Sequence, residues 1–223
     1  MTAADAAGAA GAAGVFPGAG PVHPVTLSPS ALAESATLPD PFELLADWLP
    51  ANDDPARPLM TLGTVSPDGF PDARTVLLSE FDERGLHLHT DSRSRKVGDL
   101  AATPRASLTL VWPGRQIVVQ GVVSRVRAEQ EHAAYARRSR YLQLLAWLNT
   151  DEFAALPLEE RLAAWAAYGE EHPSLAAPET WVGFVVEPVR LTFWEGRPET
   201  AGIRTEFRRD GLEAAWSVTT LAG

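Results

Sequence analysis

From Leu59 to near the end of the chain, apolar and polar residues alternate with a period of two in short runs separated by turn sequences. The linkers "PDGFP" and "DERG" carry the glycine punctuation of tight turns between the first three runs, so these runs predict an antiparallel meander. The pattern therefore favours antiparallel strands over a helical fold. The predicted strands are 59–66, 72–81, 85–91, 105–112, 116–127, 181–196, 204–209 and 214–220.

Helical spacing interrupts the strands in two places and also precedes them. Asp40 and Pro41 form a helix-start signal, and Phe42, Leu45 and Trp48 then recur at helical intervals. In the last predicted helix, one face is marked by Leu158, Leu162, Trp165 and either Tyr168 or Ala166. Strands that can close, with helices inserted between them, predict an α+β, mainly β fold built on a small antiparallel barrel. The predicted helices are 40–49, 94–102, 128–148 and 157–172.

The first 38 residues differ in composition from the rest of the chain. They are rich in Ala, Gly, Pro and Ser and contain few large apolar side chains, so they cannot bury enough surface to offset the entropy of ordering. We expect a disordered tail over 1–38 and one domain over 39–223. No apolar run reaches about 18 residues and no basic leader precedes one, so we expect a cytoplasmic protein.

Charge and residue types exclude several classes of function. A formal net charge of −10 argues against a protein that binds nucleic acid through a basic face. The chain has no Cys, which excludes disulfides and thiolate catalysis, and its 5 His residues show no metal-binding spacing. We therefore expect no metal site, no nucleic-acid partner and no membrane partner.

Lys96 is the only lysine among 19 basic residues, and it follows Ser94 and Arg95 where a predicted strand gives way to a helix. The side chains and free N–H groups of such a first turn can converge on an anion such as phosphate. A solvated basic loop is the alternative. Arg74, flanked by apolar residues in "DARTVLL", points the same way because a half-buried charge needs a partner.

Four ordered motifs extend this prediction: "RTVLL" at 74–78, "HTDSRSRK" at 89–96, "RQIVVQG" at 115–121 and "FWEGRPETAGIR" at 193–204. From about residue 40 to its C-terminus the chain resembles the pyridoxamine 5'-phosphate oxidase family of FMN-binding split β-barrels. The resemblance implies FMN as cofactor, a homodimer with cofactor sites at its interface, and oxygen as electron acceptor.

Carried over position by position, the resemblance implies which residues hold FMN. Arg74, Arg95 and Lys96 would hold its phosphate, and Gln116 would contact the flavin ring. Trp194 and Arg204 would complete the site across the dimer interface. Judged from the sequence alone, Trp194 could equally be an ordinary barrel residue and Gln116 a strand-edge residue. The full set of cofactor positions is Arg74, Thr75, Val76, Leu77, His89, Thr90, Ser94, Arg95, Lys96, Gln116, Trp194 and Arg204.

The chain departs from the family mainly where the substrate would bind. The family's Lys after "RTVLL" is Ser79, and its Arg and His after the last Trp are Thr200 and Gly202. Loss of these charges would weaken the binding of a phosphorylated substrate by about tenfold or more per contact. The expected substrate-binding positions are Ser79, Tyr135, Arg138, Arg140, Thr200 and Gly202.

Three interpretations follow. The first is an FMN-dependent oxidase of an amine or related small molecule other than a B6 vitamer. The second is a pyridoxamine/pyridoxine 5'-phosphate oxidase in which Arg138 or Arg140, with Arg197, replaces the missing cations. The third is a non-catalytic protein that binds a flavin or a deazaflavin.

Overall fold

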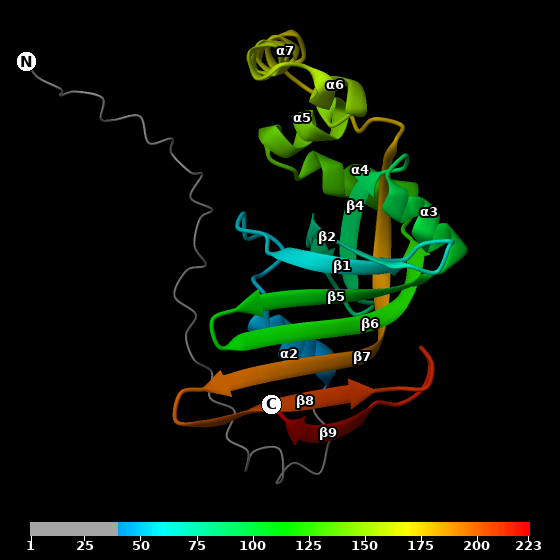
Figure 1. Ribbon diagram of the computed structural model, residues 1–223, viewed down its shortest axis with the longest axis vertical. Helices are drawn as coiled ribbons and strands as arrows, with labels where there is room; N and C mark the ends of the chain where they lie inside the picture. Colours follow the sequence, from blue (N-terminus) through cyan, green and yellow to red (C-terminus); the bar gives the residue numbers. More distant parts are fainter. Residues whose placement is uncertain (1–39) are drawn as a thin grey trace, which may run out of the picture.

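A computed structural model describes residues 40–223, and the predicted tail over 1–38 lies outside the described residues. Its centre is a curled nine-stranded antiparallel sheet (Figure 1). The strands are β1 (Leu59–Val65), β2 (Pro71–Leu77), β3 (Glu80–Phe81), β4 (Leu86–Asp91), β5 (Arg105–Trp112), β6 (Arg115–Arg125), β7 (Trp181–Arg197), β8 (Thr200–Arg208) and β9 (Ser217–Ala222). The helices are α2 (Pro41–Trp48), α3 (Arg95–Ala102), α4 (Ala128–Ala136), α5 (Arg140–Leu148), α6 (Asp151–Ala155) and α7 (Leu158–Glu171). This architecture confirms the predicted fold class.

The strand order is β2-β1-β5-β6-β7-β4-β3, and β8 and β9 continue the sheet from β7. Strand β7 is 17 residues long and pairs with β4 along its first part, with β6 along most of its length and with β8 along its last part. The sheet bends beside Gly121, where the β6–β7 register shifts and a Cβ atom would meet the Glu187 carbonyl oxygen at 2.4 Å. Glycine is the residue that permits so close an approach of two backbones.

The predicted meander of the first three runs is correct only in part: the run 72–81 pairs with both neighbouring runs, through β2 with β1 and through β3 with β4, but it divides between them. Strands β1 and β2 do form a hairpin, but β4 pairs with β7 and lies near the other end of the strand order. The chain changes its hydrogen-bonding neighbour between two consecutive residues. The N–H of Leu78 donates to the Pro58 carbonyl beside β1, and the N–H of Ser79 donates to the His87 carbonyl in β4. The chain therefore passes from one end of the sheet to the other within the run 72–81, and this passage closes the curl.

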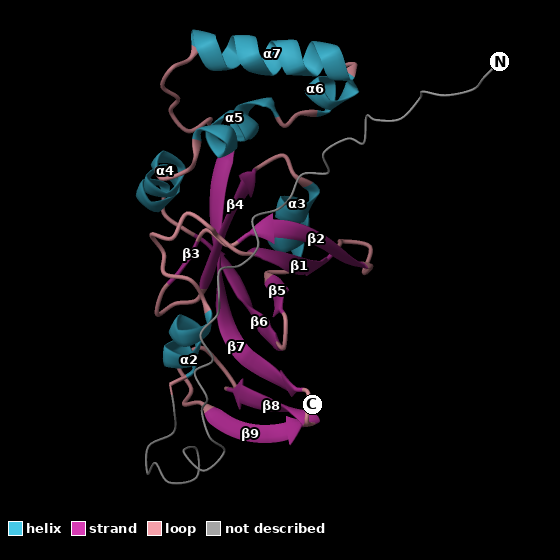
Figure 2. Cartoon of the chain, turned by 90° about the vertical axis from the view of Figure 1, so that its left-hand side faces the viewer, coloured by secondary structure: helices cyan, strands magenta, loops and turns pink. Residues whose placement is uncertain are grey.

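The core lies inside the curl, and α2 covers one opening of it (Figure 2). Asp40 caps α2 as predicted, because its carboxylate accepts a hydrogen bond from the N–H of Phe42 at 2.8 Å. Leu45 is 0% exposed, and Trp48 packs edge-to-face on Phe193 at 5.3 Å. The apolar face predicted for this helix is thus its buried face.

The predicted helix over 128–148 is two helices, because the chain breaks at 137–139 and Ser139 caps α5. Helix α7 projects from the sheet at the end of the molecule opposite to α2 (Figure 2). It has no buried residue: Leu158 and Leu162 are 61% and 63% exposed, so its apolar stripe does not face the core. Among the described residues, no helix is long and apolar enough to cross a membrane.

Candidate functional site

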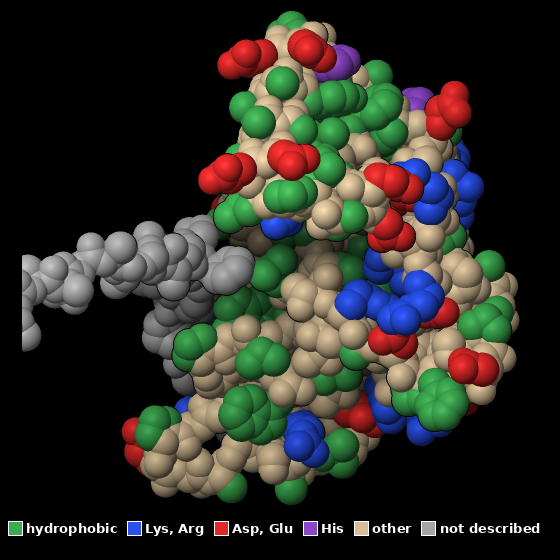
Figure 3. Space-filling view, turned by 45° about the horizontal axis from the view of Figure 1, so that its top comes forward, with side chains coloured by type: hydrophobic (Ala, Val, Ile, Leu, Met, Phe, Trp, Pro, Cys, Tyr) green, Lys and Arg blue, Asp and Glu red, His purple; other side chains and the backbone are tan. Residues whose placement is uncertain are grey.

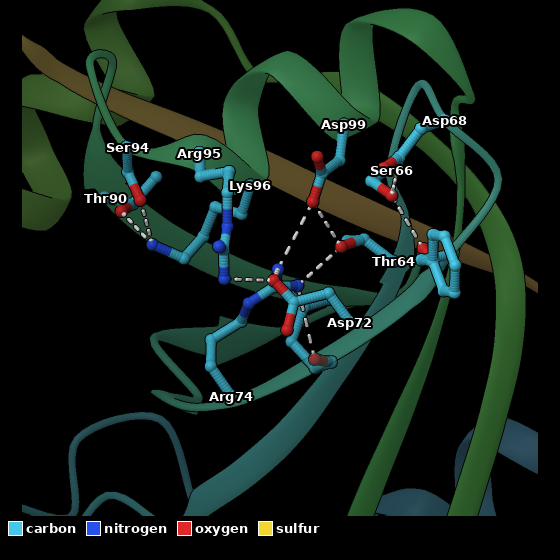
Figure 4. Close-up of polar contacts among 12 residues, drawn as sticks. Thr64, Ser66, Asp68, Asp72, Arg74, Thr90, Ser94, Arg95, Lys96 and Asp99 are labelled. Carbon is cyan, nitrogen blue, oxygen red and sulfur yellow. Dashed lines mark hydrogen bonds and ion pairs between the residues drawn. The ribbon is translucent and has the colours of Figure 1, made fainter.

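A cluster of cations lies where β2, β4 and the start of α3 meet (Figure 4). Strand β4 ends at Asp91, and the turn that follows is closed by a backbone hydrogen bond from Ser94 to Asp91. Helix α3 then begins at Arg95, so Arg95 and Lys96 stand in its first turn. The strand-to-helix junction expected from the sequence is therefore present.

Lys96 lies between the strand end and the helix start. Its Nζ donates to Thr90 Oγ1 at 3.1 Å and to Ser94 Oγ. Burial of the ammonium lowers the pKa of Lys96, and the nearby charge of Arg74 lowers it further. The Ser94 hydroxyl faces Lys96 instead of capping the helix, so no side chain caps the first-turn N–H groups of α3 from that position. These donors can therefore receive an anion.

Arg74 has the partners that its buried position required, and they belong to the protein itself. Its guanidinium donates to Thr64 Oγ1 at 2.6 Å, to Asp72 Oδ2 at 2.7 Å and to Asp99 Oδ2 at 3.2 Å. Asp99 is only 1% exposed and also accepts from Thr64 at 2.7 Å. The Asp72 carboxylate bridges to Arg95 Nη2 at 2.5 Å.

Thr64, Asp72 and Asp99 were not among the residues predicted for the site. A signal existed for both acids. Asp72 precedes Arg74 by two residues on one strand and so lies on the same face, while Asp99 follows Lys96 by three residues on one helix. Thr64 carries no such signal, because it reaches Arg74 through the pairing of β1 with β2.

Three other cofactor positions form a separate row. Gln116 pairs with Trp194, and Trp194 pairs with Arg204, so these side chains lie side by side across β6, β7 and β8. Gln116 precedes the buried Ile117 and points away from the core, whereas Arg74 pairs with the buried Leu62 and points toward it.

The row is also distant from the cation cluster along the sheet. Three strand spacings separate β2 from β6, or about 14 Å. One protomer therefore does not bring the row and the cation cluster together. Three of the remaining cofactor positions line β2: Thr75 is exposed, Val76 packs against the core and Leu77 is partly buried. The fourth, His89, lies on β4 and contacts Ser79 instead of the cation cluster.

A second polar cluster surrounds Ser79. Arg138, from the loop between α4 and α5, donates from Nη2 to Ser79 Oγ at 2.6 Å, and its guanidinium lies 5.6 Å from the ring centre of Trp181. His89 Nδ1 lies 2.8 Å from Ser79 Oγ, and the His89 ring stacks on Trp181 with centroids 5.3 Å apart. Ser79 Oγ thus accepts a hydrogen bond from Arg138 and shares a second hydrogen bond with His89 Nδ1.

Burial and the Arg138 charge both keep His89 neutral. Desolvation lowers the pKa of His89 to about 3, and the positive charge of Arg138 contributes in the same direction. Desolvation also lowers the pKa of Arg138, to about 10, with a further contribution from Arg57. Arg138 makes no ion pair with an acid among the described residues. This partly buried cation is therefore available to an anionic group.

The other two residues expected beside Ser79 are engaged elsewhere. Tyr135 is 2% exposed; its hydroxyl donates to the Gln143 carbonyl at 3.2 Å and accepts from Trp147 Nε1 at 3.1 Å. Arg140 donates to the carbonyls of Gly169, at 2.9 Å, and His172, and so anchors the end of α7.

The remaining substrate positions lie in the β7–β8 hairpin. Thr200 is exposed and pairs with Arg197, and the Arg197 guanidinium binds Glu195 at 2.7 Å. A Cβ atom at Gly202 would meet Trp194 Nε1 at 2.8 Å, and the N–H of Gly223 donates to the Gly202 carbonyl at 2.9 Å. The structure therefore does not bring Arg140, Thr200 or Gly202 to Ser79.

Comparison with known proteins agrees with this architecture. A family profile described as pyridoxamine 5'-phosphate oxidase matches residues 54–195. The chain belongs to the pyridoxamine 5'-phosphate oxidase family. A second profile, the pyridoxine 5'-phosphate oxidase C-terminal dimerisation region, matches residues 181–223 of this family member.

Relatives named pyridoxine/pyridoxamine 5'-phosphate oxidase cover most of the chain. The protein from Azorhizobium caulinodans is 36% identical over 211 residues, which are 90% of this chain and 96% of the relative. A protein of the same name from Rhodopseudomonas palustris is 38% identical over 192 residues, 82% of this chain and 89% of the relative. The similarity to these oxidases thus extends over nearly their whole length.

Two solved structures share the fold. PhzG from Burkholderia lata, in complex with tetrahydrophenazine-1-carboxylic acid, has a TM-score of 0.74 and 26% identity, covering 89% of this chain and 98% of PhzG. A pyridoxamine 5'-phosphate oxidase-related, FMN-binding protein from Nostoc punctiforme has a TM-score of 0.60 at 21% identity, covering 73% of this chain and 86% of its own. The second likeness concerns the fold alone.

Proposed function

We propose that this protein is an FMN-dependent oxidase of a small molecule, an amine or a partly reduced ring, that carries a single acidic group. The observation that carries this proposal is the cluster around Ser79, where one guanidinium, that of Arg138, has no acidic partner among the described residues. One guanidinium matches a carboxylate well, because its paired N–H groups fit the two carboxylate oxygens.

The donor set of the cation cluster fits a flavin phosphate. Arg74, Arg95 and Lys96 supply three positive charges, and the start of α3 supplies backbone N–H groups. When bound, FMN supplies the two-electron oxidation and delivers the electrons to oxygen. The protein's own residues would bind the cofactor and orient the substrate. Lys96 and Arg74 would hold the flavin phosphate. Ser79, oriented by its hydrogen bond to His89, positions Arg138.

We propose a homodimer as the active form. The row of Gln116, Trp194 and Arg204 faces away from the cation cluster, so the flavin would take its phosphate contacts from one protomer and this row from the other. The match of residues 181–223 to a dimerisation region supports this arrangement. We also propose that the protein acts in the cytoplasm.

The proposed substrate class rests on the small number of cationic side chains beside Ser79. Arg140 is engaged with the end of α7, and Gly202 has no room for a side chain. The position thus offers far fewer cations than a dianionic phosphate attracts. PhzG, whose structure contains a monocarboxylic acid, supports a substrate of this kind.

Pyridoxamine or pyridoxine 5'-phosphate is the second candidate substrate. Arg138 reaches Ser79 from another element and so places a cation where the family has Lys. The names of the relatives from Azorhizobium caulinodans and Rhodopseudomonas palustris favour the same activity.

Flavin bleaching under anaerobic conditions distinguishes the candidates. Purified protein should be yellow and release FMN on denaturation. We expect tetrahydrophenazine-1-carboxylic acid to reduce the bound flavin and pyridoxamine 5'-phosphate to reduce it at least tenfold more slowly, with Arg138→Gln raising KM for the acid. Equal or faster bleaching by pyridoxamine 5'-phosphate would establish the second candidate. A flavin that no substrate bleaches would instead favour a non-catalytic binding protein.

A further inference from the structure

The proposed phosphate site contains an anion of its own. The Asp72 carboxylate lies between Arg74 and Arg95 and accepts hydrogen bonds from both guanidinium groups, at 2.7 and 2.5 Å (Figure 4). On the face shown in Figure 3, basic side chains likewise lie directly against acidic ones. Two of the three cations expected to bind the flavin phosphate thus share one internal carboxylate.

We propose that Asp72 is a displaceable internal counter-ion, which occupies the position of the cofactor phosphate and must leave when the phosphate binds. This inference rests on the proposed FMN site. It makes Asp72 a residue that lowers the affinity of the site for phosphate and so sets how tightly the phosphorylated flavin is held.

Asp72 is held weakly enough to move. Its side chain is 28% exposed and that of Arg95 is 79% exposed, and ion pairs at such exposure contribute little to stability. Burial raises the pKa of Asp72, but the charges of Arg74 and Arg95 outweigh burial and lower it, so the group is a carboxylate at neutral pH. A dianionic phosphate offers both arginines more charge than this carboxylate does.

Arg74 stays in place when Asp72 leaves. Its guanidinium keeps Thr64 Oγ1 at 2.6 Å and Asp99 Oδ2 at 3.2 Å, and both of these partners are buried. The two acids therefore have different roles: Asp99 is a positioning residue under the guanidinium, and Asp72 competes with the ligand. Loss of each acid should change phosphate affinity in opposite directions.

The test compares Asp72→Asn with Asp68→Asn, which changes the net charge equally. Asp68 lies in the neighbouring β1–β2 turn, where its carboxylate pairs with Ser66 and contacts no cation of the cluster. We expect Asp72→Asn to tighten FMN binding to the flavin-free protein by about fivefold or more, since one charge about 4 Å from the phosphate contributes about 1 kcal/mol even at the dielectric constant of water. Riboflavin, which lacks the phosphate, should bind both variants as it binds the parent.

A second probe separates this inference from the proposed function. Inorganic phosphate, titrated by calorimetry, reports on the cluster whether or not the protein binds flavin, and Asp72→Asn should tighten its binding while Asp99→Asn weakens it. A parent protein that binds phosphate but not FMN would contradict the proposed cofactor. The phosphate titration would then still test the role of Asp72. Unchanged or weaker phosphate binding by Asp72→Asn would overturn the inference.

Discussion

At the residue scale, Lys96 has the most direct experimental readout. In the proposed FMN site, Lys96→Ala would remove a charge-assisted hydrogen bond to the flavin phosphate, so the affinity for FMN should fall about 10- to 100-fold. Lys96→Arg should be intermediate, because the charge remains while the planar guanidinium changes the geometry. The measurement is a fluorescence titration of the flavin-free protein, with riboflavin as control. An unaltered FMN affinity in Lys96→Ala would assign the phosphate to Arg74 and Arg95 alone.

His89 should make stability depend on pH. Its pKa in the fold is about 3, below the ordinary 6.5, so between these values the unfolded chain binds a proton that the native protein does not. The free energy of unfolding should therefore fall as the pH drops through this window, by at most about 1.4 kcal/mol per pH unit from this group. Urea unfolding at pH 7, 6 and 5 measures the slope.

The controls for His89 are two single substitutions. His89→Gln should flatten the dependence on pH, whereas His132→Gln, at an exposed position on α4, should leave it as in the parent. The same slope in His89→Gln and the parent would contradict the assignment of this pH dependence to His89.

Individual residues also show where sequence reasoning ends. The need of Arg74 for a partner could be predicted, because its neighbours are apolar. That its partners are Asp99 and Thr64 could not, since α3 and β1 come together only in the folded sheet. Arg138 differs, because the family resemblance grouped it with Ser79 although the two residues are 59 positions apart.

At the element scale, α2 and α7 make a matched pair. Both present an apolar stripe in the sequence, but Leu45 of α2 is 0% exposed and Leu162 of α7 is 63% exposed. Leu45→Ala should lower the free energy of unfolding by about 2–5 kcal/mol, and Leu162→Ala should change it by no more than about 0.5 kcal/mol. Denaturant unfolding of both variants tests this, and a large loss in Leu162→Ala would mean that α7 is buried in solution.

Most helices and strands could be predicted from the sequence, but which strands pair with one another could not. Local signals such as the Asp40 cap and the run 105–112 placed α2 and β5 correctly. The break between α4 and α5 was missed because residues 137–139 contain neither Gly nor Pro. The position of β4 beside β7 was missed because no local signal distinguishes a hairpin partner from a distant one.

At the scale of the whole molecule, mixed dimers test whether each cofactor site spans two protomers. In the proposed homodimer, Lys96→Ala and Arg204→Ala should each impair both cofactor sites. A heterodimer of the two variants should recover one of its two sites with near-parental FMN affinity, because the intact Lys96 of one chain meets the intact Arg204 of the other. Purification of co-expressed, differently tagged chains allows the titration. No recovery would place all of these residues in a site within one protomer.

The N-terminal segment permits a simpler test. The composition of residues 1–38 predicts that they contribute no core side chains, and α2 begins its own capped turn at Asp40. Deletion of these residues should leave the melting temperature and the flavin content unchanged. A marked loss of either would contradict the prediction of a dispensable tail.

The pairing of β4 with β7 has a consequence for synthesis of the chain. Leu88 must wait for Phe184, about a hundred residues later, before it gains its sheet partner, and β6 waits for the same strand. Hairpins such as β1–β2 can form as soon as they leave the ribosome, because their contacts are local. Strand β7 is therefore the last link of the central sheet, and until it emerges the nascent chain exposes the apolar faces and open edges of β4 and β6 to chaperones and to aggregation.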